Sequence, residues 1–376
     1  MTERWHLGSP STLRCLIPLE SYGGGANTLP RRPPPPRGLC SALARCWSHS
    51  NSCDPLFALL LLLLHGGGPC SSALHVTPPL ASFLQAAGKS VLITGCDKGF
   101  GYALARHLHA QGFTVFAGCL LKERGGDGAR QLEDLRSESL HVLQLDVCRE
   151  EEVAEALRFV RENLKEPEQG LWGLVNNAGV ASFGEVEFTS MEKFKATAEV
   201  NLWGTIRVTK AFLPLIRKAR GRVVNLASML GRMASPQRSS YCVSKFGVEA
   251  FTDCLRQEMY PWGVSVVAIE PSNFIAATGI LTREGVDSEA EQMWREASET
   301  LRADYGEAHF LQRVEQMRAF VRSGLRDVSP VLDDITEALT ARHPCTRYNP
   351  METHLWMRLQ AVTHLPTALS DWLYVK

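Results

Sequence analysis

The amino-acid sequence predicts an α/β fold: a doubly wound parallel sheet (Rossmann fold) flanked by helices, with a C-terminal helical lid. From Lys89 onward, short apolar runs alternate with stretches in which apolar residues recur at helical spacing. The runs are apolar at consecutive positions, as expected for strands that are covered on both faces. A glycine-rich turn separates the first run from the first helical stretch, where sheets of this kind bind ligands.

The elements are expected in regular alternation. The expected strands are Ser90–Thr94, Thr114–Ala117, Val142–Leu145, Trp172–Val175, Arg222–Leu226 and Val264–Ile269. The expected helices are Tyr102–Gln111, Glu151–Leu164, Met191–Lys218 and Tyr241–Tyr260. Helical stretches recur between the strands, so the strands are expected to run parallel.

Two segments follow the sixth expected strand. Residues 279–345 carry helical spacing and many charges, so we expect a lid that excludes water from the substrate. Residues 346–376 form an amphipathic segment that is interrupted by Pro366 and contains two tryptophans, a pattern suited to a lipid interface. The alternative is a helix packed on the protein's own core or on another subunit.

Residues 1–88 differ in composition from the rest of the chain. They hold eleven of the twenty prolines, six arginines, three acidic residues and no lysine. Such a segment buries too little apolar surface to fold, so we expect a disordered N-terminal extension. Its arginine-containing, acid-poor character is typical of an organelle transit peptide. An unstructured extension without that role, or an incorrectly assigned first exon, is the alternative.

Composition excludes several function classes. The chain of 376 residues has 40 basic and 40 acidic side chains, whereas a nucleic-acid-binding domain carries a basic excess. We therefore expect no nucleic-acid partner. The eleven cysteines form no Cys-x-x-Cys pair, so no metal site is expected either. No apolar run reaches the roughly 18 residues that a membrane-spanning helix needs.

The glycine-rich turn is the expected site for the pyrophosphate of a dinucleotide. Glycines let backbone amides approach a phosphate at a helix N-terminus. Asp146 follows the third expected strand, and its carboxylate can accept a hydrogen bond from an adenine amino group. Asn176 and Asn177 follow the fourth strand, and their side-chain amides can hydrogen-bond to neighbouring loops. Simple turn formation is the alternative for both. The expected cofactor-binding residues are Thr94, Gly95, Lys98, Gly99, Phe100, Gly101, Asp146, Asn177, Ala178 and Gly179.

Four side chains are expected to converge as a catalytic set: Asn201, Ser228, Tyr241 and Lys245. Hydride transfer from an alcohol requires a base for the hydroxyl proton, and a tyrosine with a pKa near 10 is a poor base at neutral pH. Lys245 lies one helical turn after Tyr241, so its ammonium would lower that pKa and bind the nicotinamide ribose. Ser228 would hold the substrate oxygen, and Asn201 would position a water that relays the proton. A tyrosine and a lysine on a solvated helix face are the alternative.

These motifs resemble the short-chain dehydrogenase/reductase family of the classical type, over about residues 89–276. The resemblance implies a dehydrogenase domain over 89–345 that binds NAD, and it adds Pro271, after the sixth strand, to the expected cofactor contacts. It also implies a homo-oligomer, a dimer or a tetramer. Two features depart from the NAD pattern, because no acidic residue ends the second strand and Lys98 precedes the second glycine of the turn.

A finer resemblance points to one branch of this family, the mitochondrial enzymes of ketone body metabolism. It rests on phrases such as Asn201–Thr205 and Ser228–Met233 and extends to His364-Leu365-Pro366. It implies NAD-linked interconversion of D-3-hydroxybutyrate and acetoacetate in the mitochondrion, at the inner membrane or on the matrix side. Phosphatidylcholine is the implied lipid partner.

Arg238 is the expected anchor for the carboxylate of such a substrate. A desolvated carboxylate needs a cation, and Arg238 lies three residues before Tyr241. The expected substrate-binding residues are therefore Ser228, Arg238 and Tyr241; a surface arginine is the alternative. Two other functions stay open: a retinol or steroid dehydrogenase, whose apolar substrate has no use for a buried arginine, and a cofactor-binding scaffold without catalysis. A scaffold would be expected to lack part of the catalytic set.

Overall fold

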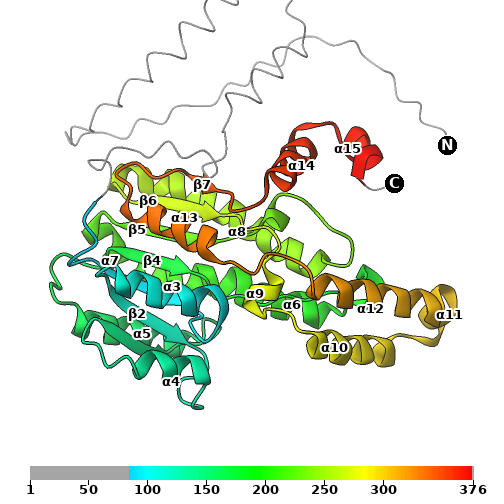
Figure 1. The fold of residues 1–376 in the computed structure, drawn as a ribbon, viewed down its shortest axis with the longest axis horizontal. Helices are drawn as coiled ribbons and strands as arrows, with labels where there is room; N and C mark the ends of the chain where they lie inside the picture. Colours follow the sequence, from blue (N-terminus) through cyan, green and yellow to red (C-terminus); the bar gives the residue numbers. More distant parts are fainter. Residues whose placement is uncertain (1–83, 375–376) are drawn as a thin grey trace, which may run out of the picture. The chain divides into compact units, whose positions relative to one another are not determined.

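The computed structural model describes residues 84–374. The predicted N-terminal extension thus lies outside the described residues, apart from residues 84–88. The described residues form a seven-stranded parallel sheet in the order β3-β2-β1-β4-β5-β6-β7 (Figure 1). The strands are β1 Ser90–Thr94, β2 Thr114–Cys119, β3 Leu140–Gln144, β4 Gly173–Asn176, β5 Arg222–Leu226, β6 Ser265–Ile269 and β7 Arg347–Tyr348.

Helices cover both faces of this sheet. The helices around the sheet are α3 Gly99–Ala110, α4 Asp127–Glu133, α5 Glu150–Asn163, α6 Met191–Ala198, α7 Thr205–Ala219, α8 Ser239–Met259 and α9 Ile275–Thr278. The later helices are α10 Arg283–Glu296, α11 Glu299–Tyr305, α12 Glu307–Val321, α13 Ser329–Thr340, α14 Thr353–His364 and α15 Thr367–Tyr374. The predicted fold class and the six predicted strands are confirmed, within a few residues at each end. The sequence did not predict β7, because two residues carry no periodicity.

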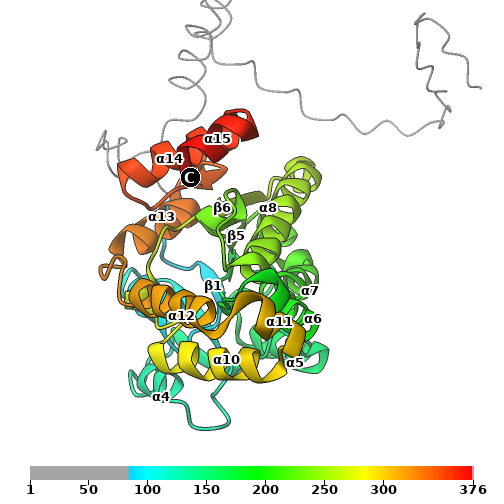
Figure 2. The same cartoon turned by 90° about the vertical axis from the view of Figure 1, so that its right-hand side faces the viewer.

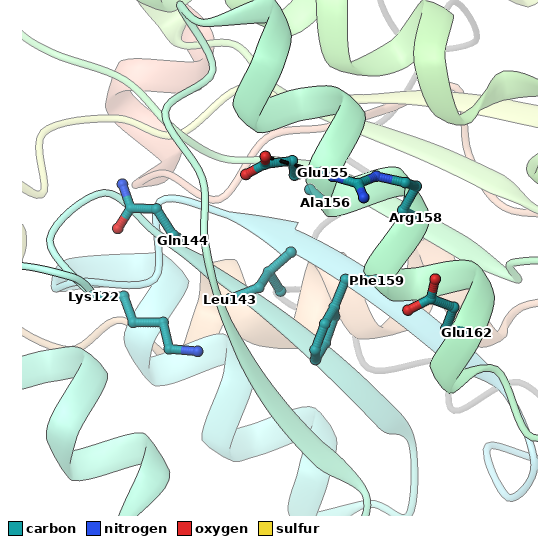
Figure 3. A pocket seen from close by; sticks show the side chains of 8 residues that line it. All are labelled: Lys122, Leu143, Gln144, Glu155, Ala156, Arg158, Phe159 and Glu162. Atoms are coloured by element: carbon teal, nitrogen blue, oxygen red, sulfur yellow. Dashed lines mark ion pairs between the residues drawn. The ribbon is translucent and has the colours of Figure 1, made fainter.

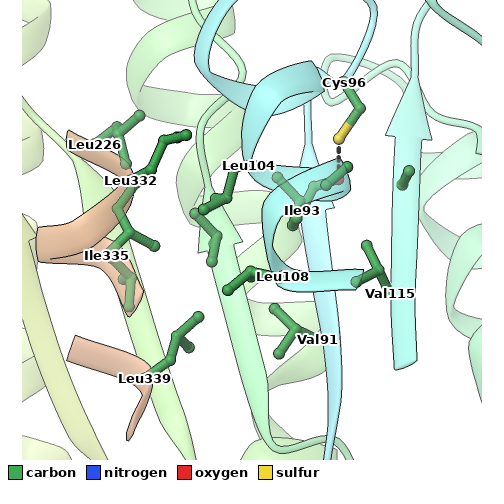
Figure 4. Close-up of a cluster of buried hydrophobic side chains, with 14 of the residues drawn as sticks. Val91, Ile93, Cys96, Leu104, Leu108, Val115, Leu226, Leu332, Ile335 and Leu339 are labelled. Carbon is green, nitrogen blue, oxygen red and sulfur yellow. Dashed lines mark hydrogen bonds between the residues drawn. The ribbon is translucent and has the colours of Figure 1, made fainter. Parts of the chain in front are cut away.

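Alternate strand residues supply two separate cores. Val91 and Ile93 of β1 pack with α3, α4 and α13 on one face (Figure 4), while Leu92 between them packs with α5, α7 and α8 on the other. Each strand therefore buries side chains on both faces, which explains why its sequence is apolar without alternation. The loops at the carboxyl ends of the strands remain free to form a site.

The segment predicted as a lid contains two different structures. Helices α10–α12 form a third apolar cluster with Phe183 and Phe188 of the loop after β4, beyond one end of the sheet (Figures 1 and 2). Helix α13 instead buries Val331, Ile335 and Leu339 against the sheet and α3. The lid therefore ends near residue 321, because the apolar face of α13 is needed to cover β4–β6.

The C-terminal segment contributes β7 and then two helices. Leu359 of α14 is fully buried and packs with Met229 and Met233, which follow β5 directly. Helix α15 exposes Leu369 and Trp372, the latter to 65%. Within residues 84–374, no helix has the combined length and apolarity needed to cross a membrane.

Candidate active site

The glycine turn after β1 has the geometry of a phosphate-binding loop. Gly95 has a φ of +71°, and a Cβ there would lie 2.8 Å from Ala178 Cα. A Cβ on Gly101 would lie 2.2 Å from the carbonyl oxygen of Gly95. Helix α3 begins at Gly99, and no side chain caps its N-terminus. The first amides of α3 are thus left for an anion such as a pyrophosphate.

Asn177 ties this turn to the end of β4. Its Nδ2 donates to the carbonyl oxygens of Thr94 (2.7 Å) and Gly95 (3.0 Å). The Thr94 hydroxyl accepts from the amides of Asn177 and Ala178. The structure therefore brings these four predicted residues together and places Gly179 directly after them.

The end of β2 shows how the departures from the NAD pattern are accommodated. The Asp97 carboxylate accepts from the amides of Leu120 (2.8 Å) and Leu121 (2.9 Å), the residues after β2. Lys98 Nζ donates to the Gly279 carbonyl oxygen at 2.8 Å, at the end of α9. In this structure Lys98 serves as a link to the lid segment, and its ammonium is not held at the end of β2.

Of three further predicted cofactor residues, Asp146 and Pro271 lie in the loops after β3 and β6, and Phe100 lies in the first turn of α3. Asp146 Oδ1 accepts from the Cys148 amide at 2.9 Å, which shapes the turn after β3. The Phe100 ring meets the Phe274 ring edge to face, with centroids 5.4 Å apart. The Pro271 carbonyl oxygen accepts from the Met229 amide at 3.1 Å, so it holds the loop that carries Ser228.

Ser228 and Tyr241 lie side by side at the end of β5. Ser228 caps the turn Met229–Gly231, with Oγ accepting from the Leu230 amide at 3.1 Å. Burial raises the pKa of Tyr241, while the charge of Arg238 and a hydrogen bond with Ser228 lower it. A phenol with these neighbours is suited to exchange a proton with a hydroxyl held by Ser228.

Lys245 and Asn201 complete the predicted set. Lys245 is buried, and its Nζ donates to the Leu226 carbonyl oxygen at 2.7 Å. The Asn201 amide is fully used: Oδ1 accepts from the Val180 amide at 2.8 Å, and Nδ2 donates to Val180 O and Ser244 Oγ. Asn201 lies in a π-helical turn, Glu199–Gly204, which interrupts the single helix predicted over Met191–Lys218.

Arg238 lies directly beside Tyr241, the predicted catalytic tyrosine. Its side chain is 5% exposed, and its guanidinium carbon is 5.3 Å from the centre of the Tyr241 ring. On the lid side, Nη1 lies 3.8 Å from Met317 Sδ, and the Phe320 ring centre is 5.5 Å away. Among the described residues, no carboxylate lies within ion-pair distance of Arg238. A buried guanidinium without an anionic partner is a binding site for an anion.

The sequence did not predict that Met317 and Phe320 of α12 cover Arg238, because no local pattern fixes where a lid helix lies. The lid is also held at its far end by Glu185, which pairs with His309 (2.9 Å) and Arg313 (3.3 Å) of α12. The helix that makes the two contacts with Arg238 is thus also tied to the loop after β4, away from Tyr241.

The structure also has two surface hollows away from these residues. One, of about 290 Å³, lies between β3 and α5 and is lined by charged side chains and Phe159 (Figure 3). The other, of about 440 Å³, lies between the end of α8 and β6. Neither is lined by a predicted site residue.

Comparison with known proteins agrees with this geometry. The family model described as short chain dehydrogenase matches residues 89–287. The chain is 57% identical over 290 residues to the mitochondrial D-beta-hydroxybutyrate dehydrogenase of Rattus norvegicus, covering 77% of this chain and 84% of that protein. Rat retinol dehydrogenase 7 is 42% identical, with 75% and 86% covered. A solved dehydrogenase from Burkholderia phymatum, in complex with NAD, shares the fold with a TM-score of 0.59 at 24% identity, with 74% and 95% covered. The chain belongs to the short-chain dehydrogenase family.

Proposed function

We propose that this protein is an NAD-dependent dehydrogenase that interconverts D-3-hydroxybutyrate and acetoacetate in the mitochondrion. The buried Arg238 beside Tyr241 is the observation that carries the proposal, because a short hydroxy acid supplies the carboxylate that Arg238 lacks. The relatives of highest identity reported above are mitochondrial D-beta-hydroxybutyrate dehydrogenases. Retinol dehydrogenases are more distant.

The residues around the glycine turn fit a dinucleotide. A pyrophosphate can approach this turn closely, because Gly101 has no room for a Cβ and the first amides of α3 have no side-chain cap. Asp146 and Asn177–Gly179 would line the adenosine and nicotinamide sides, and Pro271 would bound the nicotinamide. The engagement of Lys98 with Gly279 favours NAD over NADP, since that ammonium is not held where a 2′-phosphate would lie.

Catalysis follows from the positions of the side chains. When bound, NAD accepts a hydride from the alcohol carbon. Arg238 binds the substrate carboxylate, and Ser228 donates to the substrate oxygen. Tyr241 takes the hydroxyl proton, and the positive charge of Arg238, whose guanidinium carbon lies 5.3 Å from the centre of the tyrosine ring, favours the phenolate. Lys245 Nζ lies 5.7 Å from the same centre. A water that relays the proton would share Asn201 Oδ1 with the Val180 amide, or the Asn201 main-chain carbonyl with Thr205 Oγ1.

The two other functions fit less well. A retinol or steroid would leave the Arg238 charge buried against an apolar molecule, at a cost of several kcal/mol. A non-catalytic scaffold has no need for the complete set of Asn201, Ser228, Tyr241 and Lys245, all of which lie at this site.

We further propose that α15 meets phospholipid. Its exposed face carries Leu369, Trp372 and Leu373, while α14 is anchored by Leu359 beside the loop after Ser228. The double variant Trp372→Glu/Leu373→Glu should lose binding to phosphatidylcholine vesicles in flotation, whereas Met357→Glu on α14 serves as a control of similar exposure. Retained binding by the double variant would contradict the lipid role.

A homo-oligomer is proposed from apolar side chains that α8 leaves exposed, Val243 and Phe246. Sedimentation of the purified chain tests this, and a monomer at micromolar concentration would contradict it.

The first experiment on the activity is NADH fluorescence with the full chain, D- and L-3-hydroxybutyrate, and vesicles of phosphatidylcholine. NADH formed from the D form alone supports the proposed substrate and cofactor. No turnover of either form, with turnover of a retinol or steroid, would overturn the proposal and leave the family assignment intact.

A further inference from the structure

Lys245 is a buried cation whose negative partner is not in direct contact. Its side chain is 5% exposed and makes a hydrogen bond to the Leu226 carbonyl oxygen. Within residues 84–374, no carboxylate forms an ion pair with it at 4 Å or less. A buried ammonium without a counter-charge tends to lose its proton, and burial lowers the pKa of Lys245 to about 8.

Glu249 lies one helical turn further along α8 than Lys245 and therefore on the same face. Glu249 is 6% exposed, and Gly231 packs over both residues: a Cβ there would lie 2.9 Å from Lys245 O and 3.0 Å from Glu249 Cγ. The charge of Glu249 acts to raise the pKa of Lys245.

Glu249 is the first residue in a chain of ion pairs that continues through β7 and β6 to the segment after β5. Its Oε2 accepts from Arg347 of β7 at 3.1 Å, while Oε1 is buried without a hydrogen-bond partner. Arg347 also pairs with Glu270 of β6 at 2.9 Å, and Glu270 pairs with Arg232, after β5, at 3.3 Å. The contact with Arg347 fixes the Glu249 carboxylate, and Arg347 is itself held by Glu270.

We propose that Glu249 is the counter-charge of Lys245 and a positioning residue for catalysis. It keeps the ammonium charged beside Tyr241, and Arg347 of the C-terminal strand holds it there. The groups that act on the pair are Tyr241 on α8, Glu270 on β6, Arg347 on β7 and Arg232 after β5. Burial and Glu270 raise the pKa of Glu249 to about 7, so it is mostly ionised where Lys245 titrates.

The inference rests on the proposed function and is tested by the pH dependence of kcat/KM for hydroxybutyrate. Loss of the Lys245 proton gives a descending limb at alkaline pH. Glu249→Gln removes the counter-charge, so the limb should move to lower pH by about one unit. The pH dependence of the Kd for NADH, measured by fluorescence, should move in the same direction.

Asp253→Asn is the matched control. Asp253 lies on the same helix and accepts from the same Arg347 at 2.7 Å, but it lies two turns from Lys245. It should lose stability without moving the limb. Glu249→Asp shortens the side chain by one methylene, so it should move the alkaline limb by less than Glu249→Gln does. If the Glu249→Gln variant does not fold, Glu249→Asp replaces it in the test.

A limb that stays in place in the folded Glu249 variant, or moves equally in Asp253→Asn, would overturn this inference alone. Failure of the wild-type chain to bind NADH would instead overturn the proposed function.

Discussion

Replacing Arg238 by methionine removes the cation that is proposed to bind the substrate carboxylate and keeps an unbranched side chain in its place. Methionine keeps an apolar stem of similar length between Tyr241 and the lid, so little packing is lost. The variant leaves the substrate carboxylate in the site without a cation. Removing one partner of a buried ion pair costs about 3–5 kcal/mol. We expect about 2–4 kcal/mol here, since a small substrate retains some water, and therefore a 30- to 1,000-fold loss in kcat/KM for hydroxybutyrate.

The same variant should shift the pH profile. The charge of Arg238 lowers the pKa of Tyr241, so the methionine variant has a higher tyrosine pKa. The ascending limb of kcat/KM then moves to higher pH for acidic and neutral alcohols alike. Measured at the same pH, a neutral alcohol such as 2-butanol should lose only the activity that this shift removes, whereas hydroxybutyrate should lose more and show a raised KM.

The assay is NADH formation over a pH series, with thermal unfolding as the control for folding. The free variant should be no less stable than wild type, because it no longer buries an uncompensated guanidinium. If kcat/KM fell equally for hydroxybutyrate and for the neutral alcohol at every pH, Arg238 would not be the carboxylate anchor.

Three further predictions follow from single positions. Gly101→Ala should abolish NADH binding in a fluorescence titration, because its Cβ would lie 2.2 Å from the Gly95 carbonyl oxygen; tight binding by the variant would contradict the placement of the cofactor. Glu185→Gln should weaken the link to His309 of the lid, raising KM and speeding protease cleavage within residues 279–324; cleavage at the wild-type rate would show that the link is not needed for closure. Burial raises the pKa of Asp334 to about 8, so the folded state binds more protons than the unfolded state between about pH 4 and 8, and stability falls as pH rises across that window by up to about 1.4 kcal/mol per unit. Asp334→Asn should flatten that slope in denaturant unfolding; an unchanged slope would assign it to another group.

The sequence by itself predicted the sheet, and it named side chains that the fold brings together at the ends of the strands. The strands were readable because a strand buried on both faces must be apolar at every position, and the glycine turn was readable because Gly95 and Gly101 admit no side chain. The one-turn spacing of Tyr241 and Lys245 places both on one side of α8 without knowledge of any other element.

Contacts between segments far apart in the chain were decided only by the tertiary structure. The sequence places Arg238 near Tyr241, but its burial depends on Met317 and Phe320 of a lid helix whose position no local pattern encodes. Helix α13 was expected in the lid and covers the sheet instead, because helical spacing shows an apolar face without showing what it packs on. The link from Lys245 through Glu249 to Arg347 joins one end of α8 to a two-residue strand nearly a hundred positions later. Local propensity fixes elements and neighbours within them, while burial and charge pairing are properties of the assembled fold.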